Sequence, residues 1–205
     1  RLSAEVAALP GVDGAALTHN LPMVSDYWVQ VERAGRPAPS RDSEPTAMYY
    51  AVTPGYLDTL GVRLLRGRGF TDADRSGAPG VLLVSEGFAQ RYFPGEDPVG
   101  KRMRQVSNEE LPWLEIVGVV ADVRHYGLDR EAPPGIYEPI AQAPFASAHL
   151  VVNTRLAPVT LAAGLQSILR KMDADVPLGS VMTTASMVSN GLLVRRFLTW
   201  LIAGF

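Results

Sequence analysis

The string most suggestive of chemistry is residues 95–101 (GEDPVGK), whose spacing fits a phosphate-binding loop. Arg102 stands where Ser or Thr would hold magnesium, and Glu96 and Asp97 would place two carboxylates against the phosphates. The string also follows a predicted helix, whereas a phosphate-binding loop follows a strand and opens a helix. We therefore interpret it as a turn.

A second string with a recognisable spacing is residues 72–77 (DADRSG), which match the first half of an EF-hand calcium loop. The twelfth position of such a loop is Leu83 here, so the bidentate Glu that completes the coordination is absent. A solvated loop, in which Asp side chains accept hydrogen bonds from nearby backbone N–H groups, explains the string more simply.

Two arginines alternate with two glycines in residues 65–70 (LRGRGF), directly after a predicted strand. Backbone N–H groups and guanidinium groups together can bind an anion. The alternative is structural: the glycines allow a tight exit from the strand, and the arginines face solvent or an acidic partner. We favour the structural interpretation.

Residues for metal or covalent chemistry are few. The chain has no cysteine, which excludes thiolate catalysis, Cys-based zinc sites and iron–sulfur clusters. The histidines are His19, His125 and His149; Asp122 precedes His125 by three residues, but a strand followed by a turn need not bring them together. No Gly-x-Ser-x-Gly nucleophile elbow is present. We therefore predict no catalytic, cofactor-binding or metal-binding residue.

The composition is that of a globular protein with a sizeable core. Of 205 residues, 47% are hydrophobic and 20% are charged, which excludes wholesale disorder. The 19 basic and 21 acidic residues leave a formal charge of −2, and no run of Lys or Arg offsets it. Nucleic acid is therefore excluded as a partner.

Hydrophobic periodicity and turn residues predict alternating helices and strands. Helices are expected over residues 2–9, after Thr53 as a cap and up to Gly61, after Ser85 as a cap, and from Pro158. In the helix from Pro158, the spacing predicts one apolar face, formed by Leu161, Leu165, Ile168, Leu169 and Met172. The expected strands are residues 12–19, 27–31, 47–52, 62–65, 81–84, 116–123, 135–140, 149–154 and 181–183.

The order of these elements predicts an α+β fold. The strands on either side of the helix after Thr53 form one β-α-β unit, and those flanking the helix from Pro158 form a second. Between the units, the strands 116–123 and 135–140 are expected to pair within a smaller, strand-rich inserted lobe. Residues 24–45 are expected to form a surface excursion.

The chain ends in an apolar run over residues 197–205. One interpretation is a C-terminal helix docked on the core. The other is the first part of a transmembrane helix, which needs roughly 20 apolar residues.

Several stretches, in order, resemble one family. They are "VTPGYLDTLGVRLLRGRGFTDAD", "VLLVSEGFAQRYFPGEDPVGKRM", "EIVGVVADVRHYGLD", "GIYEPIAQ" and "LLVRRFLTWLIAGF". Together they resemble the MacB-like periplasmic core domain of FtsX-like ABC transporter permeases, of the duplicated-permease type of acidobacteria. The resemblance runs from about residue 47 to the end and is fainter over residues 1–23.

The resemblance implies a porter-like α/β lobe with an inserted Sabre-like lobe. The expected boundaries are residues 1–79 and 147–191 for the porter-like lobe, 80–146 for the Sabre-like lobe, and 192–205 for the start of a transmembrane helix.

The resemblance also implies a function without catalysis. A cytoplasmic ABC ATPase would drive a permease in the bacterial inner membrane, and this domain, on the periplasmic side, would transmit the motion outward. A second permease domain (an internal duplicate or a homodimer mate) and a periplasmic adaptor protein are the other implied partners. The helix after Thr184, which runs through Met187 and Leu192 into the membrane segment, is the expected transmission element. The expected membrane-boundary residues are Leu192, Arg195, Arg196, Phe197 and Trp200.

Two alternatives stay open at this point. One is an extracytoplasmic module that binds a ligand or peptide without coupling to transport, which would need a concave pocket with convergent polar groups. The other is a soluble enzyme, which would need a cluster of ionisable side chains that the sequence does not reveal.

Overall fold

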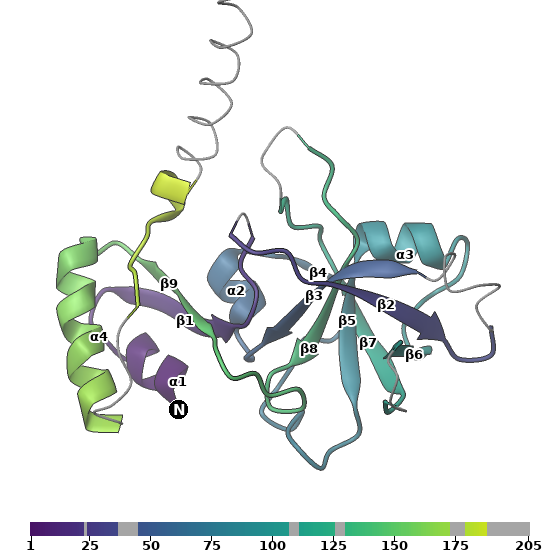
Figure 1. The fold of residues 1–205 in the computed structure, drawn as a ribbon, viewed down its shortest axis with the longest axis horizontal. Coiled ribbons are helices and arrows are strands. Elements are labelled where there is room, and N and C mark those ends of the chain that lie inside the picture. The colour runs from purple at the N-terminus through teal and green to yellow at the C-terminus, as the bar shows by residue number, and fades with distance from the viewer. Residues whose placement is uncertain (23, 37–44, 107–110, 126–129, 173–178, 188–205) are drawn as a thin grey trace, which may run out of the picture.

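The computed structural model describes residues 1–22, 24–36, 45–106, 111–125, 130–172 and 179–187 (Figure 1). They form an α+β fold, in which one mixed, nine-stranded sheet carries short helices. In chain order the elements are α1 (Leu2–Ala7), β1 (Val12–Thr18), β2 (Trp28–Arg33), β3 (Thr46–Val52), α2 (Tyr56–Leu60), β4 (Leu64–Gly67), β5 (Val81–Ser85), α3 (Glu86–Tyr92), β6 (Arg102–Gln105), β7 (Leu114–Val120), β8 (Gly135–Pro139), β9 (His149–Thr154) and α4 (Pro158–Met172).

Most of the sheet closes on itself as a barrel. Its strands follow the order β2-β6-β7-β5-β8-β3, and β2 also pairs with β3, which completes the ring. The pairs β3–β8 and β5–β7 are parallel, and the other pairs in the ring are antiparallel. Strand β4 pairs with the C-terminal half of β7, from Gly118 to Val120. Because the ring is closed, every strand in it has a hydrogen-bonded neighbour on both sides.

Residues 47–52 in β3 are buried along their whole length because both faces of the strand are covered. Tyr49 belongs to the apolar cluster inside the barrel, with Leu82, Ile116 and Ile136. Its neighbour Tyr50 belongs to a second cluster on the opposite face of the strand. Helix α3 covers the first cluster with its buried Phe88.

A separate layer lies beside the barrel and contains α1, α4, β1 and β9 (Figure 1). Strand β1 pairs with β9 along its length, and α1 and α4 pack on the resulting ribbon. The buried face of α4 is formed by Leu161, Leu165 and Ile168, at the helical spacing that the sequence predicts. These residues and Val6 of α1 form a third apolar cluster. We call these four elements the α-layer.

The α-layer joins the barrel at the end of β1 and where Ala16 and Val151 pack in the second cluster. Thr18 is registered with Val52 of β3, and the backbone N–H of Leu17 donates to the Thr53 hydroxyl oxygen over 2.9 Å. Thr53 therefore does not cap α2 as predicted. The N-cap position is Gly55, which has a φ of 85°.

Both predicted β-α-β units are wrong in their pairing. Strand β4 pairs with β7 and not with β3, so α2 does not connect two neighbouring strands. Residues 181–183 are not a strand; helix begins at 184 instead. Strand β8 pairs with β3 and β5 rather than with β7. Local apolar patterns identify strands, but partners are chosen by contacts between segments far apart in the chain.

Candidate functional site

Residues 95–101 form a turn between α3 and β6, as predicted. Gly95 and Gly100 have φ values of 73° and 80°, which favour glycine. Lys101 Nζ lies 3.4 Å from the Glu96 carboxylate of the same turn. A strand follows the turn and no helix does, so its N–H groups are not arranged for a nucleotide phosphate.

The loop over residues 72–77 is held by an ion pair between Arg68 and Asp74. The Arg68 guanidinium donates to both carboxylate oxygens of Asp74, over 2.8 and 2.9 Å, and the Thr71 N–H donates to Asp74 over 2.8 Å. The hydrogen bonds from Arg68 hold the pKa of the buried Asp74 below its usual range. Arg68 of the 65–70 string thus binds the protein's own carboxylate, and Arg66 lies 3.9 Å from Asp97, as the structural interpretation expects.

His125 is buried between two partners that are distant in the sequence. Its Nδ1 lies 2.7 Å from the Tyr50 hydroxyl, and its Nε2 lies 2.9 Å from Asp26 Oδ1. Asp122, the partner weighed from spacing alone, accepts a hydrogen bond from the Gly87 N–H instead. The Asp26–His125–Tyr50 chain ties the segments before β2 and after β7 to strand β3.

His19 packs among aromatic rings at the junction between β1 and β3. Its Nδ1 accepts a hydrogen bond from the Ala51 N–H over 2.9 Å, and its ring stacks on Phe145 with centroids 4.0 Å apart. Burial, with a smaller contribution from the charge of His149, lowers the pKa of His19 to about 4. The ring is therefore neutral near pH 7. Over the described residues, no group of three or more His, Asp or Glu side chains could hold a metal ion.

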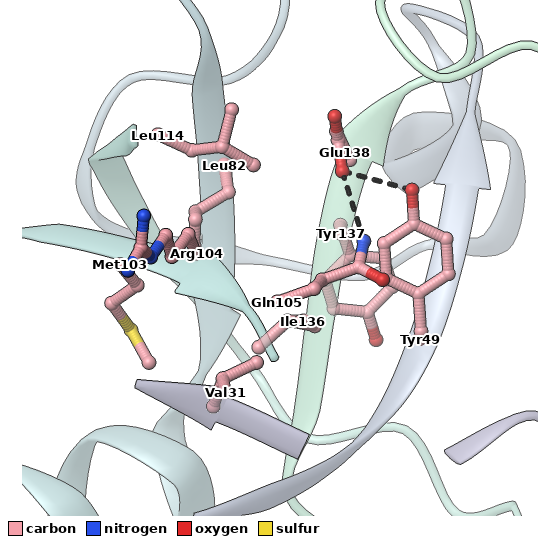
Figure 2. A pocket seen from close by; sticks show the side chains of 10 residues that line it. All are labelled: Val31, Tyr49, Leu82, Met103, Arg104, Gln105, Leu114, Ile136, Tyr137 and Glu138. Atoms are coloured by element: carbon pink, nitrogen blue, oxygen red, sulfur yellow. Dashed lines mark hydrogen bonds between the residues drawn. The ribbon is translucent and has the colours of Figure 1, made fainter. Parts of the chain in front are cut away.

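The barrel interior contains one acidic side chain that the sequence analysis did not single out (Figure 2). Glu138 of β8 is buried and accepts a hydrogen bond from the Tyr49 hydroxyl over 2.9 Å; the Gln105 amide nitrogen lies 3.5 Å from the same oxygen. Burial raises the pKa of Glu138. Burial and the nearby Glu138 charge also raise the pKa of Tyr49.

The free space beside Glu138 is small. The cavity that Figure 2 shows has a volume of about 10 Å³. That is room for about one water molecule, whereas ligand sites measure roughly 300–1,000 Å³. The interior acid is therefore a structural group and not part of a ligand site.

The five predicted membrane-boundary residues, from Leu192 to Trp200, lie outside the described residues. The transmission helix that is expected after Thr184 is described only over residues 184–187, where it is helical. The Ser186 N–H donates to the Thr183 hydroxyl oxygen over 3.1 Å, which caps this turn. In the described parts of the chain, no helix has the length and apolar character needed to cross a bilayer.

Comparisons with known proteins agree with this geometry. Residues 3–172 match the family described as MacB-like periplasmic core domain. No curated protein matches the chain.

Three solved structures share the fold at low sequence identity. The periplasmic region of MacB from Actinobacillus actinomycetemcomitans is 16% identical, with a TM-score of 0.58 over 83% of this chain and 72% of that one. The extracellular domain of the noncanonic ABC-type transporter YknZ from Gram-positive bacteria is 16% identical, with a TM-score of 0.54 over 83% and 81%. A domain of a permease protein from Porphyromonas gingivalis is 17% identical, with a TM-score of 0.55 over 91% and 84%.

The family match covers most of the chain and spans the elements from α1 to α4, apart from the first residue of α1. The chain therefore belongs to the MacB-like periplasmic core domain family, the non-enzymatic extracytoplasmic domains of MacB-like ABC-type permeases.

Proposed function

We propose that this domain transmits ATP-driven motion from a cytoplasmic ABC ATPase to the outer side of the bacterial inner membrane. Its partners in this role are the ATPase, a second permease domain (an internal duplicate or a homodimer mate) and a periplasmic adaptor protein. Membership of the MacB-like family supports the proposal. The duplicated-permease type of acidobacteria is the architecture that we propose for the whole protein.

The observation that carries the proposal is the construction of the α-layer. Its apolar cluster, with Val6, Leu161, Leu165 and Ile168, is separate from the two clusters of the barrel. The layer is joined to the barrel through the end of β1 and through Ala16 and Val151, which pack in the second cluster beside α2. Force transmission needs a rigid element that is connected to the moving part at a defined place, and the α-layer has this form.

The finer assignments follow from the same role. The helix that begins at Thr184 is proposed to continue through Leu192 into a membrane segment, with Arg195, Arg196, Phe197 and Trp200 at the boundary. The proposed porter-like lobe comprises residues 1–79 and 147–191. Residues 80–146 are the proposed Sabre-like lobe, and residues 192–205 are the proposed start of a membrane helix. The sheet pairs β2 and β3 with strands from residues 80–146, so the two lobes would share one barrel.

A second candidate function is a binding module. One observation favours it, an open cleft of about 540 Å³ on the barrel, which is large enough for a ligand.

The proposed function requires the domain to lie outside the cytoplasmic membrane. The chain has no cysteine, so Ser76→Cys in an exposed turn provides one labelling site in a full-length protein without other thiols. We expect a membrane-impermeant maleimide to label Ser76→Cys in intact cells, while the buried Leu83→Cys control stays unlabelled. Labelling of Ser76→Cys only after lysis would place the domain in the cytosol and refute the proposal.

A further inference from the structure

The cleft of about 540 Å³ opens on the barrel near the ends of β2 and α3 and the start of β6. These elements lie at the far end of the molecule from α1 and α4 (Figure 1). The turn that resembles a phosphate-binding loop, residues 95–101, contributes to its wall. The cleft is therefore remote from the α-layer, and its properties can be tested independently of force transmission.

The mostly buried side chain of Arg33 lines the cleft. Its guanidinium lies 3.8 Å from the centre of the Phe93 ring, and only 12% of the side chain is exposed. It donates to the backbone carbonyl of Tyr92, and its second nitrogen lies 3.3 Å from Glu96 Oε2. Stacking and hydrogen bonds together fix the guanidinium, so its charge is pre-organised.

Positive charge exceeds negative charge among the residues that line the cleft. The four cations Arg33, Arg36, Lys101 and Arg102 face a single carboxylate, that of Glu96, and four minus one leaves +3. Arg36 lies 2.8 Å and Lys101 lies 3.4 Å from this carboxylate, so three cations share it. Their pairing lowers the pKa of Glu96.

Among the described residues, the carboxylates near the cleft have partners of their own or lie opposite a cation. Glu32 is paired with Arg104, and Asp97 lies 3.9 Å from Arg66. Glu115 is opposite Arg102 in the β6–β7 register and therefore offsets part of the charge of Arg102, which leaves Arg33, Arg36 and Lys101 around Glu96. Because the whole chain carries −2, the excess of positive charge is local. A concave, cationic surface concentrates the field toward an anionic partner.

We propose that this cleft binds an acidic, carboxylate-rich segment of a partner protein. Arg33, Arg36 and Lys101 already hold the Glu96 carboxylate within 3.4 Å, and guanidinium groups suit carboxylates geometrically. Trp113, with the Arg104 guanidinium 4.5 Å above its ring, provides an aromatic wall for peptide side chains. Such a wall favours a peptide over a compact phosphate headgroup.

The test is binding of fluorescent hexaglutamate to the full chain, measured by anisotropy. We expect binding that weakens strongly between about 50 and about 300 mM NaCl, because salt screens exposed charges. The double change Arg36→Gln with Lys101→Gln is expected to weaken binding about fivefold to tenfold. The matched control, Arg155→Gln with Lys171→Gln, removes the same charge from exposed residues of the α-layer region and is expected to change binding less than about twofold.

The change Glu96→Gln distinguishes recognition from a general structural effect. It removes the carboxylate that competes for the cations, so hexaglutamate is expected to bind about threefold more tightly; a purely structural role of Glu96 would weaken binding. Circular dichroism establishes that each variant is folded, and if Glu96→Gln unfolds, the Arg36 and Lys101 double change decides.

Several outcomes would overturn the proposal. They are an absence of hexaglutamate binding, an equal loss in the control pair, and displacement of hexaglutamate by inorganic phosphate at equal concentration. Binding to vesicles rich in phosphatidylglycerol without binding to hexaglutamate would assign the cleft to a lipid surface instead, and would equally refute it.

Discussion

The change Leu165→Ala tests whether the α-layer is a unit with its own apolar core. Leu165 is 4% exposed, and it packs in the third cluster with Val6, Leu161 and Ile168. The change removes the equivalent of about three methylene groups at about 0.8 kcal/mol each. With the cavity that remains, we expect the free energy of unfolding to fall by about 3 kcal/mol. For a chain of this length, that lowers Tm by about 6–12 °C.

The assay is urea unfolding followed by circular dichroism, with Val159→Ala as the control. Val159 lies on the same helix and is 77% exposed, so its change is expected to stay within about 0.5 kcal/mol. Hydrogen exchange is then expected to quicken in α1, α4 and β9, while β5 and β7 in the barrel keep their protection. A loss below about 1 kcal/mol, or an equal loss of protection in β5 and β7, would refute the separate core.

Three further predictions concern the barrel and its loops. Burial raises the pKa of Glu138, so the folded state binds this proton more tightly than the unfolded state, whereas the pKa of His19, lowered to about 4, makes stability fall as pH falls. The contribution of Glu138 is therefore the difference between the native chain and Glu138→Gln in urea titrations, and the native chain is expected to gain stability relative to the variant as pH falls through the folded pKa of Glu138. The pKa of Asp74 is lowered in the folded state, so Asp74 stabilises the fold above its unfolded pKa, and this stabilisation is lost as pH falls through the folded pKa. Asp74→Asn should lower the free energy of unfolding by about 1–2 kcal/mol at pH 7. In urea titrations at several pH values, the variant should also lose less stability on the acid side than the native chain does. A Cβ on Gly67, at φ 72°, would lie 2.2 Å from the Val117 carbonyl oxygen, so Gly67→Ala should lower the free energy of unfolding by more than the roughly 1–3 kcal/mol of a left-handed residue. The control is Gly61→Ala, at φ 68° with nothing within 4 Å of the added Cβ. This change should lower stability less in the same thermal melts.

Local sequence patterns were sufficient for most helices and strands. The apolar spacing of Leu161, Leu165 and Ile168 identified the buried face of α4. Ser85 was predicted as a cap, and its side chain accepts a hydrogen bond from the Phe88 N–H. These features depend on residues that are close in the chain, where propensity and capping act directly.

Strand partners and buried polar contacts depend on distant residues and were not predictable in this way. Nothing near Asp26 in the sequence indicates His125, which lies 99 residues away. Glu138 carries a weak signal, because it is an acidic residue inside a strand with an otherwise apolar face, but its partner Tyr49 is 89 residues away. The cleft likewise joins Arg33 to Glu96 across 63 residues. A single sequence contains no measure of such pairings.

The most direct test of force transmission is a distance measurement during ATP turnover. A donor dye on Ser76→Cys and an acceptor dye on the second permease domain would be followed by energy transfer in the full-length permease with its ATPase. The account predicts that the distance between the two dyes changes on addition of ATP and magnesium. With an ATPase variant that cannot bind nucleotide, the distance is expected to stay constant. An unchanged distance while the ATPase is hydrolysing ATP would contradict the account.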